Sequence, residues 1–306
     1  MADDSEWDWI DALRKRTAAH PSAPIGIGDD AALLRCAGRE TLVATDMLMD
    51  GVDFVVGETP PELIGRKCLA VNLSDIAAMA GRPRAMFISL ALPRRGGRAL
   101  VEGLYAGLEP LAREFDVALA GGDTNAWDGP LVVNVTVVGE PVAPGPVARS
   151  GARPGDVVFV TGPLGGSLPS LRHCTFTPRV REALALLAAA PLHAMIDLSD
   201  GLATDLSHIA RESGCGIVIE AERVPVHADV PSGDHSDRLR RALTDGEDFE
   251  LAFCVSANDA ARLESDPPAG VALHRIGEVV AGSGLMLRQG ADQRPIDRTG
   301  WQHRFA

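Results

Sequence analysis

The composition and charge of this 306-residue chain exclude several classes of protein. Its hydrophobic content of 46% and charged content of 23% are typical of a soluble globular protein, and its length suits one large or two ordinary domains. The balance of 29 Lys+Arg against 42 Asp+Glu gives a net charge of −13, which argues against a surface for nucleic acid or an anionic membrane. Cations would have to mediate any binding of phosphate groups.

The cysteines and the N-terminus predict a cytoplasmic protein. The five cysteines are scattered and form no CxxC pair, which favours reduced thiols over a disulfide framework or a zinc site. Residues 1–6 are acidic and lack an apolar signal region. The sequence has no run of about 18 apolar residues, so we expect no membrane-spanning segment.

The first half of the chain predicts alternating helices and strands with acids beside glycines. Asp30 follows a glycine-rich turn, and Asp46 and Asp123 are expected at the C-terminal ends of strands, where α/β folds place ligand groups. Helices are expected over three ranges: 7–19, 61–80 and 98–114. Strands are expected over four: 41–45, 86–92, 117–120 and 131–138.

The helix that begins near Pro61 has an unusual interior. It is apolar on nearly every side, which predicts burial, and Thr59 is its expected N-cap. Asn72 and Asp75, spaced i,i+3, nevertheless share one face. An uncompensated buried carboxylate is strongly unfavourable, so Asp75 requires a cation or hydrogen-bond donors. A hydrogen bond from a neighbouring loop is the purely structural alternative.

A proline-rich stretch at 141–146 predicts a linker and divides the chain into domains 1–143 and 144–306. The motif Asp197-Leu198-Ser199-Asp200 echoes residues 72–75, which fits two related α/β halves. A surface loop is expected over 231–238. Helices are expected over 179–190 and 203–212, and strands over 157–160, 217–220, 251–255 and 271–276.

The acids point to phosphoryl transfer. Carboxylates without a zinc-type His/Cys pattern suit Mg²⁺, which typically bridges them to substrate phosphates. Direct transfer needs positioning and charge neutralisation but no protein nucleophile. Paired carboxylates also occur in glycosidases, but that reading leaves the glycine loops unexplained and finds few aromatics for stacking. The unusual acids are Asp30, Asp46, Asp75, Asp123, Asp197 and Asp200.

Nine sequence blocks together resemble the thiamine-monophosphate kinase family, whose superfamily includes aminoimidazole ribonucleotide synthetase and selenophosphate synthetase. The blocks run in order from residue 26 to 305: GIGDDAA (26–32), TDM…DGVDF (45–54), KCLAVNLSDIAAMAG (67–81), GGDT (121–124), R-SGARPGD (149–156), VTGPLGGS (160–167), IDLSDGL (196–202), GEDFEL (246–251) and GW-H-F near the end. The resemblance implies ATP-dependent phosphorylation of thiamine monophosphate to thiamine diphosphate by in-line transfer, with several Mg²⁺ ions and no protein nucleophile.

The resemblance also implies a mixed α/β fold of two domains. The N-terminal domain would bind ATP and Mg²⁺, and its sheet would pair with that of a second copy in a homodimeric β-barrel. The C-terminal domain would be α/β. The implied metal ligands are Asp30, Thr45, Asp46, Asp75, Asp123, Asp197 and Asp200.

Two further groups of residues are implied to contact the nucleotide and the substrate. Arg149 suits the nucleotide because a guanidinium forks onto phosphate, and the ring of Trp301 can stack on a cationic thiazolium. The implied ATP contacts are Gly122, Asp123, Arg149 and Ser199. The implied substrate contacts are Asp53, Glu247 and Trp301.

The chain departs from the family pattern at Asp53, where the family usually has His. A carboxylate near a phosphate adds repulsion unless a metal or an arginine compensates it. The family's GGDTT also becomes GGDT followed by Asn125. Two alternatives therefore stay open: a sibling enzyme acting on another small substrate with Mg-ATP, and a catalytically silent Mg-nucleotide-binding protein.

Overall fold

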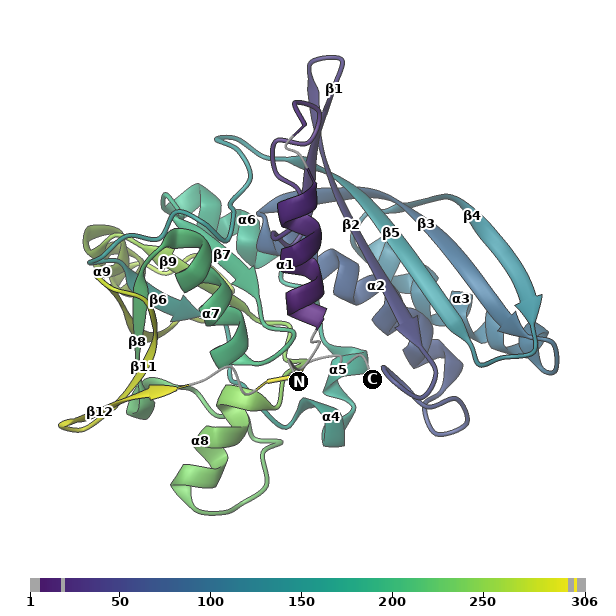
Figure 1. The fold of residues 1–306 in the computed structure, drawn as a ribbon. Coiled ribbons are helices and arrows are strands. Elements are labelled where there is room, and N and C mark those ends of the chain that lie inside the picture. The colour runs from purple at the N-terminus through teal and green to yellow at the C-terminus, as the bar shows by residue number, and fades with distance from the viewer. Residues whose placement is uncertain (1–5, 18–19, 297–299, 302–306) are drawn as a thin grey trace.

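The computed structural model describes residues 6–17, 20–296 and 300–301. The chain forms two halves that lie side by side, each built on its own β-sheet (Figure 1). Helix α1 (Glu6–Arg16) joins the second half through an ion pair of Arg14 with Glu212. None of the helices in these ranges is long and apolar enough to cross a membrane.

The first half is a five-stranded sheet covered on one face by two helices (Figure 1). Its strand order is β1-β2-β5-β3-β4, and only the β3–β4 pair is parallel. Strand β5 alternates buried and half-buried residues, as expected for a sheet with one covered face. The elements are β1 (Ala32–Cys36), β2 (Arg39–Met49), α2 (Pro61–Ala78), β3 (Gly81–Pro93), α3 (Gly97–Glu114), β4 (Ala118–Trp127) and β5 (Val132–Pro141).

Helix α2 is buried on all sides, and glycines make this possible. A Cβ atom at Gly65 of α2 would lie 1.9 Å from the carbonyl oxygen of Leu104 in α3. One at Gly107 of α3 would lie 1.7 Å from the carbonyl oxygen of Glu62. The two helices therefore meet backbone to backbone, while α2 also packs against the sheet and the second half.

The second half is a seven-stranded sheet in the order β12-β11-β8-β10-β6-β9-β7. Its core joins that of the first half, because α5 and α6 pack against α2. Helix α7 covers β7, β8 and β11. The strands are β6 (Val157–Val160), β7 (Ala194–Asp197), β8 (Gly216–Glu220), β9 (Leu251–Val255), β10 (His274–Val280), β11 (Gly284–Gln289) and β12 (Asp292–Ile296). The helices are α4 (Ser167–Ser170), α5 (Arg172–Thr175), α6 (Val180–Ala189), α7 (Leu202–Ser213), the short η1 (Ala221–Arg223), α8 (His235–Thr244) and α9 (Ala257–Ser265).

The predicted mixed α/β class is confirmed, but several local predictions are wrong. Strands β2 and β4 extend beyond their expected ends, so Asp46 and Asp123 lie inside strands. Pro60, not Thr59, precedes α2 as its N-cap residue, and no side chain caps the helix. The expected loop 231–238 contains the start of α8, because the Asp234 carboxylate accepts a hydrogen bond from the Asp237 amide and caps it.

Strands β1, β11 and β12 and helix α9 have no counterpart among the predicted elements. The division of the chain at 143/144 stays a prediction.

The contact of α2 with α3 predicts a destabilised Gly107→Ala variant. The added methyl group collides with backbone that cannot move aside, so we expect the free energy of unfolding to fall by about 3 kcal/mol, although alanine is the better helix former. Urea denaturation measures this change. The control is Ala106→Gly, at the exposed neighbouring position, which should lose only about 1 kcal/mol. Equal losses in the two variants would contradict the close contact.

Candidate active site

Four carboxylates from four different segments converge beside the second half of α2. Asp75 comes from α2, Asp46 from β2, Asp30 from the loop before β1, and Asp197 from the end of β7. Ligand oxygens of Asp30, Asp75 and Asp197 all lie within 4.8 Å of one another. The carboxyl group of Asp46 hydrogen-bonds that of Asp75. The structure thus brings together four of the predicted metal ligands.

Burial makes these acids hold protons more tightly than they would in water. It raises the pKa of Asp46 to about 6, with Asp53 and Asp30 adding repulsion, although the hydrogen bond to Asp75 opposes the shift. Burial and the Asp46 charge raise the pKa of Asp75 well above its usual value. Burial also raises the pKa of Asp197, although the Ser74 hydroxyl donates to its carboxylate at 2.6 Å. Such a cluster is stable only with protons or cations.

Arg149 supplies one cation to this cluster. Its Nη2 and Nε atoms donate to the two oxygens of Asp30 at 2.8 and 3.0 Å, and its backbone amide donates to Asp29 at 2.7 Å. Burial alone would lower the pKa of Arg149. The surrounding carboxylates, Asp30 foremost, raise this pKa by more, so the guanidinium stays charged. The arginine predicted to bind ATP therefore lies beside the predicted metal ligands.

Unsatisfied oxygens show that one arginine does not complete the cluster. Asp46 Oδ2 and Asn72 Oδ1 are both buried without a hydrogen-bond partner. The other end of the Asn72 amide is committed, since its Nδ2 donates to the Cys68 carbonyl at 3.1 Å. Carboxylate and amide oxygens are the donors that hard divalent cations prefer. The residues present therefore fit Mg²⁺.

A cavity of about 690 Å³ opens from the acid cluster. Its volume suits a small-molecule ligand. Asp46, Ser199 and Asp200, which were predicted to bind metal or nucleotide, line it together with Thr45. Lys67 and the three predicted substrate contacts (Asp53, Glu247 and Trp301) line the same cavity among apolar side chains: Val52, Val71, Leu168 and Phe249.

Two sequence motifs meet in the wall of this cavity and pair through their backbones. The amide of Glu247 donates to the Ser199 carbonyl at 2.7 Å, and that of Phe249 donates to the Leu198 carbonyl at 2.8 Å. Glu247 and Phe249 have φ angles of 53° and 51°, which L-residues rarely adopt. Such strain is kept where the surrounding structure fixes it, and it is typical of functional sites.

Trp301 lies at the mouth of the cavity with 54% of its surface exposed. Its backbone amide donates to the Asp200 carbonyl at 3.1 Å. Gly300 makes this approach possible, because a Cβ atom there would lie 1.9 Å from the same carbonyl oxygen. Gly300 and Trp301 are thereby attached next to Asp200, which precedes helix α7.

Asp53 lines the cavity, and one oxygen of its carboxylate is engaged within its own turn. Its Oδ2 accepts a hydrogen bond of 2.7 Å from the Met49 amide, which closes the turn after β2. Its carbonyl oxygen accepts a second bond, at 2.8 Å, from the Lys67 ammonium group. The residue that replaces the family's histidine is therefore engaged through both its side chain and its backbone.

Three predicted site residues do not join the cluster within this chain. Gly122 and Asp123 lie on β4, which strands β5 and β3 separate from β2 and Asp46. The Asp123 carboxylate is exposed and accepts bonds from the Thr124 amide and the Asn125 side chain. The Thr45 hydroxyl contacts Thr136, its neighbour on β5, at 2.9 Å, and successive residues of a strand face opposite sides, so it points away from the Asp46 carboxylate.

The sequence analysis did not identify several residues that lie beside the site. Lys67 is buried and binds Glu247, and its only sequence signal is a lysine inside an apolar helix. Asp205 accepts hydrogen bonds from the amides of Asp200 and Gly201. Ligand atoms of Asp200, Asp205 and His208 lie within 4.8 Å of one another, which sequence spacing alone does not distinguish from helix packing.

The glycine loop after β6 is held in place by acids. Gly165 donates its amide to Asp248 at 2.9 Å, and Gly166 donates to Asp245 at 3.0 Å. These amides are therefore committed to carboxylates of the protein and do not form a phosphate cradle. The glycines of this loop serve to position the neighbouring segment 245–249.

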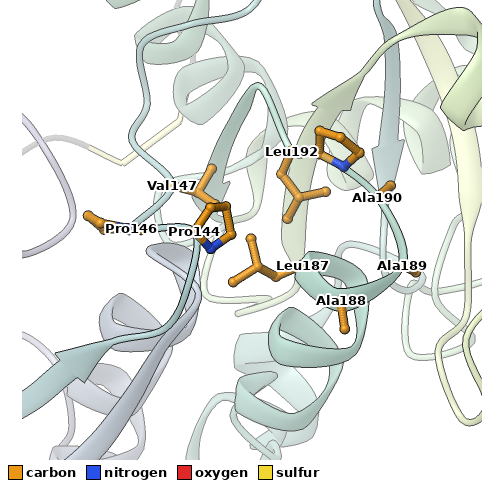
Figure 2. Close-up of a pocket in the computed structure, with 10 residues that line it drawn as sticks. Pro144, Pro146, Val147, Leu187, Ala188, Ala189, Ala190 and Leu192 are labelled. Carbon is orange, nitrogen blue, oxygen red and sulfur yellow. The ribbon is translucent and has the colours of Figure 1, made fainter.

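A second cavity, of about 430 Å³, lies at the linker between the two halves. Figure 2 shows Pro144 and Val147 on one side of it and Leu187 and Leu192 on the other. No charged side chain lines it. It therefore lacks the chemistry for phosphate groups, in contrast to the cavity beside Asp75.

Comparison with known proteins agrees with the geometry of the cavity. The model of the AIR synthase related protein N-terminal domain matches residues 28–140, and that of the C-terminal domain matches residues 153–288. A thiamine-monophosphate kinase of Rhodopirellula baltica is 40% identical over 294 residues, covering 92% of each chain. That of Bacillus subtilis is 35% identical, covering 97% of this chain and 99% of its own.

Solved structures give the same result. The structure of AaThiL complexed with AMPPCP and TMP superimposes with a TM-score of 0.83 at 28% identity, covering 99% of this chain and 98% of the other. The thiamine-monophosphate kinase of Stenotrophomonas maltophilia gives a TM-score of 0.72 at 36% identity, covering 92% and 96%. This chain therefore belongs to the AIR synthase related family and, within it, to the thiamine-monophosphate kinases.

Proposed function

We propose that this protein transfers the γ-phosphate of ATP to thiamine monophosphate and so forms thiamine diphosphate. The observation that carries the proposal is a single cavity that opens beside the carboxylate cluster at Asp46 and is also lined by Glu247 and Trp301. A relative in the same family has been solved with AMPPCP and TMP together. The carboxylates suit metal-bound phosphates, and Glu247 and the Trp301 ring suit a cationic heterocycle.

Direct transfer is the reaction that these side chains support. The Ser74 hydroxyl is buried and committed to Asp197, so it is not free to act as a nucleophile. Burial raises the pKa of the Cys68 thiol far above neutrality, which keeps it protonated and unreactive. The cavity instead offers positioning and charge, which are what in-line phosphoryl transfer requires.

Asp30, Asp46, Asp75 and Asp197 are the residues of this cluster that would hold Mg²⁺. When bound, Mg²⁺ would neutralise phosphate charge and favour in-line transfer. Arg149 orients Asp30 through two hydrogen bonds, and Asp200 faces the cavity from the second half of the fold. Ser199 lines the same wall and retains its predicted role toward ATP.

The activity is tested by supplying purified protein with ATP, Mg²⁺ and thiamine monophosphate. We expect thiamine diphosphate as the product, detected by chromatography. Asp75→Asn should lower kcat at least about 10³-fold while keeping its circular dichroism spectrum, because the loss concerns charge at the site rather than packing. A folded unmodified protein that forms no thiamine diphosphate would overturn the proposal, and near-normal turnover by Asp75→Asn would remove Asp75 from the metal site.

Stability in the presence of a chelator gives a second prediction, for Asp46→Asn. Between about pH 4 and pH 6 the folded wild-type protein keeps the Asp46 proton while the unfolded chain has lost it. The wild-type free energy of unfolding therefore falls as pH rises through this window, whereas asparagine does not titrate. We expect the variant to gain roughly 2–3 kcal/mol relative to wild type between pH 4 and pH 7.

Denaturant unfolding in EDTA at several pH values measures this difference. Added Mg²⁺ should narrow the gap at pH 7, because it stabilises the wild-type acids and binds the variant less well. A stability difference that does not change with pH would contradict the buried charge at Asp46.

We also propose that the protein acts as a homodimer whose subunits complete each other's sites. Strand β1 pairs only with residues 39–43 of β2, so residues 44–49 have β5 on one side and no strand on the other within the described ranges. Strand β4 is the opposite edge and is exposed along its length. An unpaired edge of this kind is a template for another strand. Exposed apolar side chains on these two strands support the pairing: Met47 on β2, and Leu119 and Trp127 on β4.

Such a pairing would place β4 of one subunit beside residues 44–49 of the other and bring Asp123 near Asp46. Co-expression of Asp75→Asn with Asp123→Asn tests this, because each homodimer lacks an acid in both sites while the mixed dimer keeps one intact site. We expect the mixture to recover about a quarter of wild-type activity, since half of the dimers are mixed and each has one working site. A monomer in sedimentation, or a mixed dimer without activity, would overturn the proposal.

The cytoplasmic location remains a prediction. Four cysteines are buried as free thiols in the described part of the chain, which supports a reducing compartment: Cys68, Cys174, Cys215 and Cys254.

A further inference from the structure

We propose that Lys67 is a positioning residue that fixes the Glu247 carboxylate and the turn at Asp53, and thereby sets recognition of the amino-bearing, cationic heterocycle of the substrate. The inference rests on the proposed kinase function and adds a residue to it. It is carried by the contacts, burial and rarity of this lysine.

The Lys67 ammonium group is held between two acceptor groups of the protein. Its Nζ lies 2.8 Å from both oxygens of the Glu247 carboxylate and 2.8 Å from the Asp53 carbonyl oxygen. Its side chain is only 1% exposed, which leaves little of it open to a substrate phosphate. Lys67 therefore acts through the residues that it holds and not by direct contact with the reacting atoms.

The ion pair is buried at one partner and open at the other. The Lys67 side chain is 1% exposed, whereas that of Glu247 is 24% exposed and lines the cavity. Burial raises the pKa of Glu247, and the charge of Lys67 opposes that shift. An ionised carboxylate only accepts hydrogen bonds, so a ligand that meets it must bring a donor or a positive charge. The amino group and cationic ring of thiamine have that character.

The side chain of His173 lies near Glu247 but does not supply the positive charge that Lys67 provides. The imidazole Nε2 of His173 lies 4.0 Å from Glu247, and its Nδ1 faces the Ser167 carbonyl at 3.2 Å. Burial and the Lys67 charge lower the pKa of His173 to about 4, so the ring is neutral at pH 7. Lys67 is thus the cation that balances Glu247, and its loss leaves a carboxylate without a partner at the strained 247–249 turn.

The choice of lysine is itself unusual in this chain. Lys15 and Lys67 are the only two lysines among 29 basic residues. The compact ammonium group of Lys67 contacts the Glu247 carboxylate and the Asp53 carbonyl at once, whereas a planar guanidinium is larger and donates within one plane.

The first test replaces Lys67 with methionine, which keeps most of the side-chain volume and removes the charge. We expect the KM for thiamine monophosphate to rise at least about tenfold, while the KM for ATP changes less than about twofold. The matched control is Arg66→Met, from the same helix turn, whose guanidinium donates to the Phe176 carbonyl at 2.6 Å and does not line the cavity. It should leave both KM values within about twofold.

A double-mutant cycle separates positioning from general destabilisation. In the Glu247→Gln background, Lys67→Met should raise the KM for thiamine monophosphate by less than about threefold, because the carboxylate that it positions is gone. An undiminished effect in that background would overturn the inference. So would equal increases in the KM for ATP and for thiamine monophosphate.

A second measurement needs no variant. Protein labelled with ¹³C at the lysine ε position gives two signals, and exposed Lys15 serves as the internal reference. Thiamine monophosphate should shift the Lys67 signal and leave that of Lys15 unchanged, whereas equal or absent shifts would overturn the inference in a protein that turns the substrate over. A protein that forms no thiamine diphosphate would instead refute the proposed function, so the two failures are distinguishable.

Discussion

The constraint on which the structure depends is the burial of several negative charges beside one helix. Asp197 is buried, and Asp46 and Asp75 are half-buried, at the contact between the two halves of the fold, where the loss of solvent raises the pKa of each. Native stability is a small difference between large terms, so repulsion of this kind has to be offset elsewhere. The continuous apolar core around α2 provides that compensation, since α2 packs at once on α3, on the first sheet and on α6.

Helix α2 also fixes the distance between the carboxylate cluster and the Lys67–Glu247 pair. Lys67, Val71 and Asp75 follow one another at intervals of four residues, and the first two line the cavity directly. At 1.5 Å per residue, the eight residues from Lys67 to Asp75 span roughly 12 Å along the helix. A rigid element therefore separates the carboxylate cluster from the Lys67–Glu247 pair. Because α2 is buried by its glycine contact with α3, neither end can shift independently of the other.

The sequence predicted what depends on local pattern. The apolar periodicity of residues 98–114 predicted α3 with an error of one residue, and the buried run 251–255 predicted β9 without error. The acids of the cluster could be identified because each interrupts an apolar or glycine-rich stretch. The burial of the helix around Asp75 followed from the same reasoning, although the Asp75 side chain itself is half-buried.

What the sequence could not supply is the pairing of distant segments. The interaction of Lys67 with Glu247 joins residues 180 positions apart, and no periodicity encodes it. Arg149 was identified, but its bidentate contact with Asp30 depends on how the linker returns to the first half. Asp123 shows the limit most clearly. Its motif is specific, yet in the sheet two strands, β5 and β3, lie between its strand and that of Asp46. Residues at a sheet edge can complete a site only through chains or elements that lie beyond that edge.

Asp53 illustrates how a local substitution is absorbed by such long-range contacts. A carboxylate in place of a histidine adds negative charge near a phosphate-binding cavity, which is unfavourable if the group points inward. Here the carboxylate accepts the Met49 amide and completes its own turn, and the Lys67 ammonium group lies against the carbonyl of the same residue. The local charge of Asp53 and Glu247 is thus offset by a buried cation, and the turn keeps its place because backbone groups hold it. Recognition of the substrate by Asp53, Glu247 and Trp301 stays a prediction, and the contacts of Asp53 show how its charge is accommodated beside the cavity.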